Sequence, residues 1–190
     1  MKKIRTVSLE TPFHIKNGLQ WDIYPRPQMQ RDSFLPLNAD WSLFSIKGNE
    51  KKSLGTITVP FPPESMLSGQ EITPEKGARL EYVKSFKVSE DFLRAKTLLH
   101  FGACDQIARV TLNGIYLGEH IGGYLPFEFD ITPFAKKGKN KLKVVLYNDI
   151  TQKDGGDKVY AATGLGWDSY KDGWHHCPPG IGIYNRVFAE

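Results

Sequence analysis

Alternation of apolar and polar residues along Arg79–Val88 constrains the fold of this chain more than any other feature of the sequence. Apolar side chains recur at nearly every second position from Leu80 to Val88, with mostly polar residues between them. A period of two is that of a β-strand with one buried face, because successive side chains of a strand point to opposite sides of the sheet. The stretch therefore predicts a central strand packed on a hydrophobic core.

Similar short segments, β-branched or alternating, recur along most of the chain. The further predicted strands are 41–46, 55–59, 97–101, 108–112, 115–119, 127–131, 142–147 and 184–188. Asn113-Gly114 joins two of them and is a strong hairpin signal, because both residues tolerate the positive φ angles of a type I′ turn. The polar stretch 137–140 predicts the turn before the strand 142–147.

Helical signals are confined to two stretches, 89–93 and 132–135, each long enough for a single turn. Many short strands with regular turn signals and no helix-length periodicity predict an all-β fold, an antiparallel β-sandwich. Residues 1–40 lack periodicity and are rich in proline, so we expect an extended N-terminal arm that contributes at most an edge strand. The sandwich domain is expected to occupy residues 41–190.

Composition excludes some classes of function. The net charge of +4 comes from lysines scattered near turns, and no window concentrates Lys and Arg as in a nucleic-acid-binding protein. Cys104 and Cys177 are too few for a secreted disulfide scaffold, and whether they pair stays open. No apolar segment follows the N-terminal Met-Lys-Lys and none reaches membrane-spanning length, so we expect a cytoplasmic protein unless a natural leader has been removed.

The strand pattern fails between Asp149 and Gly182. This stretch is rich in glycine, tryptophan, tyrosine and histidine rather than in alternating apolar residues. A long aromatic loop between two strands is unusual in a compact domain and indicates a function.

Several motifs in order carry a resemblance to a known family. They are the segments 59–69 (VPFPPESMLSG), 98–105 (LLHFGACD), 110–114 (VTLNG), 118–132 (GEHIGGYLPFEFDIT) and 182–187 (GIYNRV). This succession resembles the N-terminal sugar-binding domain of family 2 glycoside hydrolases, which include β-galactosidases, β-glucuronidases and β-mannosidases. The resemblance covers residues 41–190 and implies a jelly roll of the galactose-binding-domain type.

Much of the motif pattern has a structural explanation that involves no ligand. Gly122-Gly123 allows a sharp bend, and Pro126 begins a strand where no amide donor is needed. Phe127 and Phe129 lie two residues apart, so they share one face of a strand. These residues therefore identify the fold rather than the chemistry.

The resemblance implies that this chain is a non-catalytic part of a longer hydrolase. Retaining glycosidases need two carboxylates about 5–5.5 Å apart, and in family 2 both glutamates lie in a later (β/α)8 barrel of upward of about 200 residues. Asn49-Glu50 resembles the family's acid/base dipeptide but follows Gly48 in a charged turn. We therefore expect no catalytic residue here and a parent protein of β-galactosidase type, with the barrel of the same chain as partner and homo-oligomers open.

In related enzymes the last loop of this domain reaches the terminal sugar, and several members place an Asp six positions before the closing Gly-Ile. Here that position is His176. Sugar sites combine aromatic faces with directional hydrogen bonds. The candidate sugar-binding residues that offer this combination are Trp167, Asp168, Asp172, Trp174, His175 and His176. The alternative is that the tryptophans pin the loop to the sandwich while the histidines cap backbone groups.

Metal and cofactor signals are weak. His175-His176-Cys177 has ligand chemistry but no fourth ligand at useful spacing, and Cys104 has no activating histidine nearby in sequence. We expect no metal and no cofactor, and a carbohydrate as the ligand. The alternatives left open are an independent carbohydrate-binding module or lectin, and a purely structural interaction domain. The sequence leaves the sugar itself undetermined.

Overall fold

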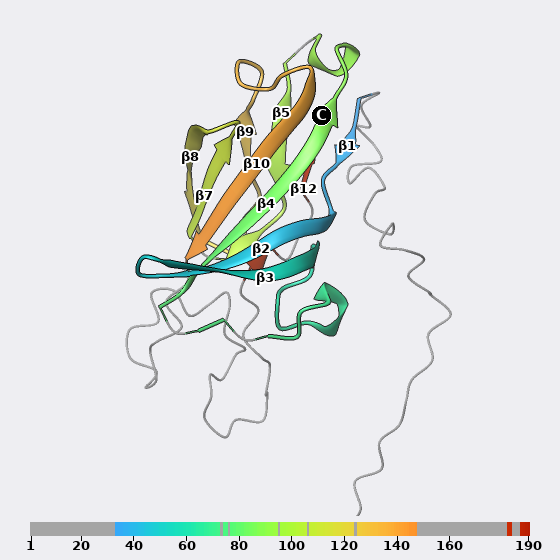
Figure 1. The fold of residues 1–190 in the computed structure, drawn as a ribbon. Helices are drawn as coiled ribbons and strands as arrows, with labels where there is room; N and C mark the ends of the chain where they lie inside the picture. Colours follow the sequence, from blue (N-terminus) through green and yellow to red (C-terminus); the bar gives the residue numbers. More distant parts are fainter. Residues whose placement is uncertain are drawn as a thin grey trace, which may run out of the picture.

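The computed structural model of the chain describes residues 33–72, 74–75, 77–94, 96–105, 107–123, 125–147, 182–183 and 187–190. These residues form two antiparallel sheets packed face to face (Figure 1). The larger sheet has the strand order β3-β2-β4-β10-β7-β8. Its strands are β2 (Ala39–Lys47), β3 (Glu50–Val59), β4 (Arg79–Val88), β7 (Ile107–Leu112), β8 (Ile115–Ile121) and β10 (Gly138–Tyr147).

The smaller sheet has the order β1-β12-β5-β9 and closes the other side of the core. Its strands are β1 (Leu35–Pro36), β5 (Leu98–Phe101), β9 (Phe127–Asp130) and β12 (Val187–Ala189). A two-stranded ladder joins β6 (Cys104–Asp105) to β11 (Gly182–Ile183). Helix in the described residues is limited to the 3-10 turns η3 (Met66–Ser68) and η4 (Asp91–Leu93). The expected all-β antiparallel sandwich of jelly-roll type is confirmed.

The central position of β4 and β10 follows from their alternation. β4 has the bounds that the sequence pattern predicts, Arg79–Val88, and pairs with β10 over its whole length. β10 also pairs with β7 over residues 142–147, so its backbone is hydrogen-bonded to a neighbouring strand on both edges there. The predicted central strand Arg79–Val88 is confirmed, and the predicted strand 142–147 is part of the other central strand, β10.

Two strands, β10 and β3, begin four and five residues earlier than the sequence pattern predicts. β10 begins at Gly138, so most of the predicted turn 137–140 is strand. The buried Asn140 explains this, since its Nδ2 donates to the carbonyl of Lys136 at 2.7 Å and its Oδ1 accepts from the Lys136 amide at 2.9 Å. The polar residue thus holds the preceding turn while its own backbone is in the ladder. β3 likewise begins early, at Glu50, because the β2–β3 hairpin extends as a polar ribbon beyond the core.

The predicted Asn113-Gly114 turn is present, and both short helical signals correspond to single turns. Asn113 and Gly114 have φ angles of 53° and 87°, as the hairpin signal requires. The helical signal at 89–93 corresponds to η4, where Ser89 Oγ accepts from the Phe92 amide at 3.2 Å. The signal at 132–135 is a hydrogen-bonded turn in which the Phe134 and Ala135 amides donate to the Ile131 carbonyl. Neither stretch is an α-helix.

Apolar residues of the two inner faces form one core. Trp41 lies at its centre, almost fully buried, and its indole nitrogen donates to the Leu37 carbonyl at 2.7 Å. Phe127 and Phe129 share the inner face of β9 as predicted, and Phe127 stacks on Phe101 with ring centroids 4.8 Å apart. Cys104 is buried in this core, and burial raises the pKa of its thiol. The division at residue 40 between arm and domain stays a prediction.

Candidate functional site

The predicted sugar-binding residues Trp167, Asp168, Asp172, Trp174, His175 and His176 lie outside the described residues. Cys177, and with it the open question of a pair with Cys104, also lies outside them. Their role stays a prediction. The structure does describe the two strands between which this segment runs, β10 and β11.

Both of these strands meet the same short stretch of chain. Tyr147, the last residue of β10, pairs with Ile107, and Gly182, the first residue of β11, pairs with Asp105. Asp105 and Ile107 are two residues apart in sequence. The segment 148–181 therefore leaves and rejoins the sandwich at one end of the molecule, the end toward which the β10 arrow points in Figure 1.

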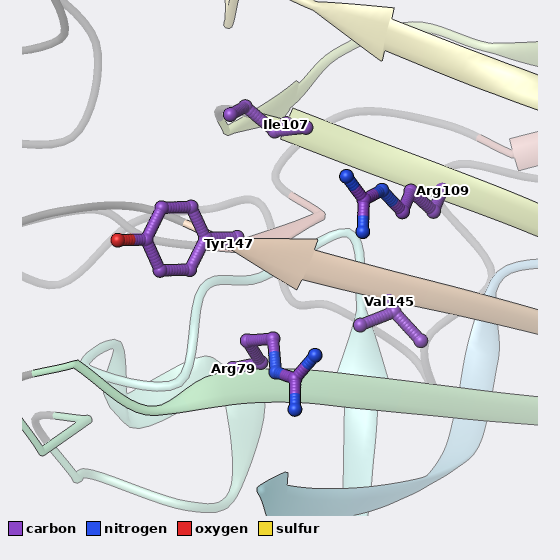
Figure 2. A pocket seen from close by; sticks show the side chains of 5 residues that line it. All are labelled: Arg79, Ile107, Arg109, Val145 and Tyr147. Atoms are coloured by element: carbon purple, nitrogen blue, oxygen red, sulfur yellow. The ribbon is translucent and has the colours of Figure 1, made fainter. Parts of the chain in front are cut away.

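A pocket of about 230 Å³ opens at this end, on the outer face of the larger sheet. It is lined by Arg79, Ile107, Arg109, Val145 and Tyr147. Figure 2 shows Arg79 and Arg109 on opposite sides of β10, with Tyr147 at the tip of the strand between them. The pocket thus combines an apolar floor with two guanidinium groups.

Strand register explains why these five residues meet. Tyr147 of β10 lies opposite Arg79 of β4 on one edge and opposite Ile107 of β7 on the other. Val145 lies opposite Arg109 in the same way, two residues earlier. Because residues directly opposite one another share a face, all five point away from the core. The intervening positions of β10, such as Leu146, are buried in the core.

The two arginines differ in their electrostatic partners. Arg109 Nε donates to Glu119 Oε2 at 2.5 Å across the β7–β8 pair, and this hydrogen bond raises the pKa of Arg109. Arg79 makes no ion pair with any described residue. Glu81, the nearest carboxylate on β4, is bound by Lys51 Nζ at 2.6 Å. Arg79 is therefore an exposed cation available to an anionic ligand.

Two carboxylates flank one histidine on the outer face of the smaller sheet. His100 Nδ1 lies 3.0 Å from Glu128 Oε2, and His100 Nε2 lies 3.1 Å from Glu190 Oε1. The imidazole also stacks on Phe188, with ring centroids 4.6 Å apart. Since the imidazole occupies the space between the carboxylates, the cluster is a packing unit that joins β5, β9 and the end of β12.

Other motif residues have structural positions. His120 of the Gly-Gly-Tyr motif stacks on Phe127 at 4.2 Å, and burial lowers its pKa, partly offset by a hydrogen bond to the Gly122 backbone. Glu50 is exposed at the start of β3, opposite Lys47 in the charged hairpin. The described residues contain no group of three or more His, Cys, Asp or Glu side chains placed to hold a metal ion. No helix in this part of the chain is long and apolar enough to cross a membrane.

Comparison with models of known protein families identifies the family of this chain. The family model for the sugar-binding domain of glycosyl hydrolases family 2 matches residues 66–161, about half of the chain. The chain belongs to this family. The match begins at η3 and includes β4, β7, β8 and β10, so it covers the strands that build the pocket of this family 2 domain.

Individual relatives agree with this assignment. Over 109 residues the chain is 36% identical to a β-glucuronidase of Formosa agariphila, an alignment covering 57% of this chain and 10% of that protein. Over 68 residues it is 49% identical to a β-galactosidase of Thermoanaerobacter pseudethanolicus, covering 36% and 9%. The fold is similar to that of a β-D-mannosidase from Dictyoglomus thermophilum, with a TM-score of 0.58 and 21% identity over 83% of this chain and 22% of that one.

The family 2 domain thus spans about a tenth of the length of the curated relatives that it matches. Their names differ in the sugar, so the similarity fixes the family and leaves the sugar open. The pocket residues Arg79, Arg109 and Tyr147 were not singled out from the sequence. Their alternation with buried residues marks them as outward-facing, but which outward-facing residues meet depends on strand register.

Proposed function

We propose that this chain is the non-catalytic N-terminal domain of a longer retaining glycoside hydrolase, of β-galactosidase type. In this proposal the catalytic carboxylates belong to a barrel elsewhere in the parent protein, which the domain supports. The segment 149–181 contributes Trp167, Asp168, Asp172, Trp174, His175 and His176 to the subsite for the terminal sugar of a β-glycoside.

The observation that carries the proposal is the common attachment of both ends of this segment. Tyr147 pairs with Ile107 and Gly182 pairs with Asp105, so the two attachment points of the segment lie close together at one end of the sandwich. A segment fixed at both ends loses less conformational entropy on binding than a free tail of equal length. This arrangement suits a loop that completes a site built mainly by another domain.

The test is kinetic and uses the full-length enzyme. At least one of the separate variants His176→Ala and Asp168→Ala is expected to lower kcat/KM about three- to tenfold, since one sugar hydrogen bond contributes up to about 1.5 kcal/mol net. Asp91→Ala is the matched control, because Asp91 is exposed on η4 and its carboxylate pairs only locally with Arg94. If both loop variants keep kcat/KM within threefold while the fold is intact, the loop is packing and the proposed contacts are wrong.

An independent carbohydrate-binding module is the second candidate. The observation that favours it is the pocket on the larger sheet, which is built entirely from residues of this domain. A module of this kind binds sugar without a catalytic barrel. Titration of the isolated chain with glycans separates the two candidates, because half of a shared subsite binds only weakly or not at all.

A further inference from the structure

Six cationic side chains lie on the outer face of the three central strands of the larger sheet, β4, β10 and β7. They are Arg79, Lys87, Arg109, Lys139, Lys141 and Lys143, and we call this surface the cationic face. The register places them together, because Lys87 lies opposite Lys139 and Lys143 follows on β10 two residues before Val145. The residues between them on β10, Asn140, Leu142 and Val144, are buried.

The cationic face concentrates the charge of the chain. Glu81 is the one acidic residue on this face of the three strands, and it is bound by Lys51 of β3. Six cations and one carboxylate give a net charge of +5, compared with +4 for the whole chain. Of the six, only Arg109 forms an ion pair with a described residue. The face is therefore an unneutralised cationic surface on a chain that is otherwise close to neutral.

Clustering of cations on one face destabilises the folded state. Lys87 and Lys139 are directly opposite on antiparallel strands, where like charges repel at close range. Among the described lysines outside this face, Lys47, Lys51, Lys96 and Lys137 form ion pairs, whereas Lys52 and Lys136 do not. The cationic face differs from the rest of the surface in that its like charges are clustered, which indicates a surface adapted to an anionic partner.

The pocket at one end of the face indicates the chemistry of that partner. Arg79 and Arg109 present planar forks that match a carboxylate. Between them, Tyr147, Val145 and Ile107 form an apolar floor suited to the C–H side of a sugar ring. From the pocket, Lys143, Lys141 and Lys139 continue along β10 at the spacing of alternate strand residues, about 7 Å. A repeating anionic chain can therefore contact the pocket and the lysine row together.

We propose that the cationic face binds an acidic polysaccharide, a polymer of uronate sugars whose carboxylates contact Arg79 and Arg109 and then the lysines of β10. The choice of a carbohydrate rests on the proposed function of the domain. Its residues differ from those of the subsite assigned to residues 149–181. A nucleic acid fits less well, because single strands stack their bases on successive aromatic side chains and Tyr147 is the one aromatic residue on this face of the three strands.

The experiment compares two double variants of the 190-residue chain that lose equal charge. Arg79→Gln/Lys143→Gln removes two cations of the face, and Lys52→Gln/Lys96→Gln removes two exposed cations outside it. Affinity for polygalacturonate is measured by calorimetry at two salt concentrations, with neutral dextran and double-stranded DNA as comparison polymers. We expect the face variant to bind polygalacturonate about tenfold or more weakly and the control variant to change less than about twofold.

Three results would overturn the proposal. They are no binding of polygalacturonate, an equal loss of affinity in both double variants, and equal affinity of the unmodified chain for DNA. The experiments can separate an error in the proposed cationic face from an error in the proposed function of the domain. A loss of kcat/KM in His176→Ala without polygalacturonate binding rejects only the cationic face, whereas the opposite combination rejects only the loop subsite.

Discussion

Replacing Gly118 by alanine places a methyl group against the ring of Phe129. A Cβ atom at Gly118 would lie 2.8 Å from Phe129 Cε1, closer than two carbon atoms approach without repulsion. The ring has little room to move, because it packs edge-on against both Phe127 and Phe101 at centroid distances of 5.8 and 6.4 Å. The contact arises where β8 of the larger sheet crosses β9 of the smaller one.

The size of the effect follows from this geometry. Overpacking by one methyl group in a constrained core costs about 1–3 kcal/mol. The φ angle of 152° at Gly118 adds strain for a residue with a side chain. For a chain of this length each kcal/mol lowers Tm by about 2–4 °C. Gly118→Ala is therefore expected to lower the free energy of unfolding by about 1–4 kcal/mol in chemical denaturation, with a parallel fall in Tm.

A double-mutant cycle isolates the contact. Leucine at position 129 lacks the Cε1 atom, and the Cδ1 position of the present ring is 3.7 Å from the added methyl, an ordinary contact distance. Phe129→Leu should thus recover about 1 kcal/mol or more of the cost of Gly118→Ala. Gly138→Ala is the control, since its φ is 88° with no atom within 4 Å, so it reports backbone strain alone. A cycle with no coupling between positions 118 and 129 would refute the steric reasoning.

Two further predictions concern buried polar groups. His100→Ala should cost about 2–4 kcal/mol in the free energy of unfolding, because it removes a buried imidazole that stacks on Phe188 and lies 3.1 Å from a Glu190 carboxylate only 2% exposed. The exposed pair of Lys137 with Glu90 is the comparison, and Lys137→Ala should cost less than about 1 kcal/mol; equal costs would show that the His100 cluster is not a stabilising unit. Burial raises the pKa of Cys104, so in a Cys177→Ser background the native thiol should resist alkylation at pH 8. Above its ordinary pKa of about 8.5 the unfolded thiol ionises first, so stability should fall as pH rises by up to about 1.4 kcal/mol per unit. A Cys104→Ala variant with the same alkaline slope would contradict this.

The sequence predicted the structure correctly where a local pattern determines the backbone conformation. Arg79–Val88 alternates over ten residues, so both its strand state and its bounds were predictable. Asn113-Gly114 was predictable as a turn because few other residues accept its φ angles. The start of β10 was not predicted, because asparagine is typical of turns. The Asn140 side chain does hold the preceding turn, but its backbone belongs to the strand. Only the position of Lys136 and of Asn113, whose Nδ2 donates to Asn140 Oδ1 at 2.8 Å, resolves that ambiguity.

The cationic face could not be found along the sequence, because it is assembled from three strands that are distant from one another in the chain. No single window holds more than three of its cations, and those in β10 alternate with buried residues. The register of β4, β10 and β7 brings Arg79, Arg109 and the lysines together, and a shift by one residue would turn each of them inward. The segment 136–143 holds five lysines, but the sequence alone does not show which of them share a face with Arg79 and Arg109.

The points where the segment 148–181 joins the sandwich could not be predicted from the sequence for a different reason. β6 and β11 are two residues long, too short for a period to be visible, yet their pairing decides that Gly182 returns beside Asp105. Tyr147 then has two roles, as the last residue before the proposed loop subsite and as part of the pocket floor. The pocket and the two attachment points of the segment consequently lie at one end of the sandwich. Tyr147→Ala is for this reason unsuitable as a test of either one, and substitutions at Arg79 and His176, on separate segments, can distinguish them.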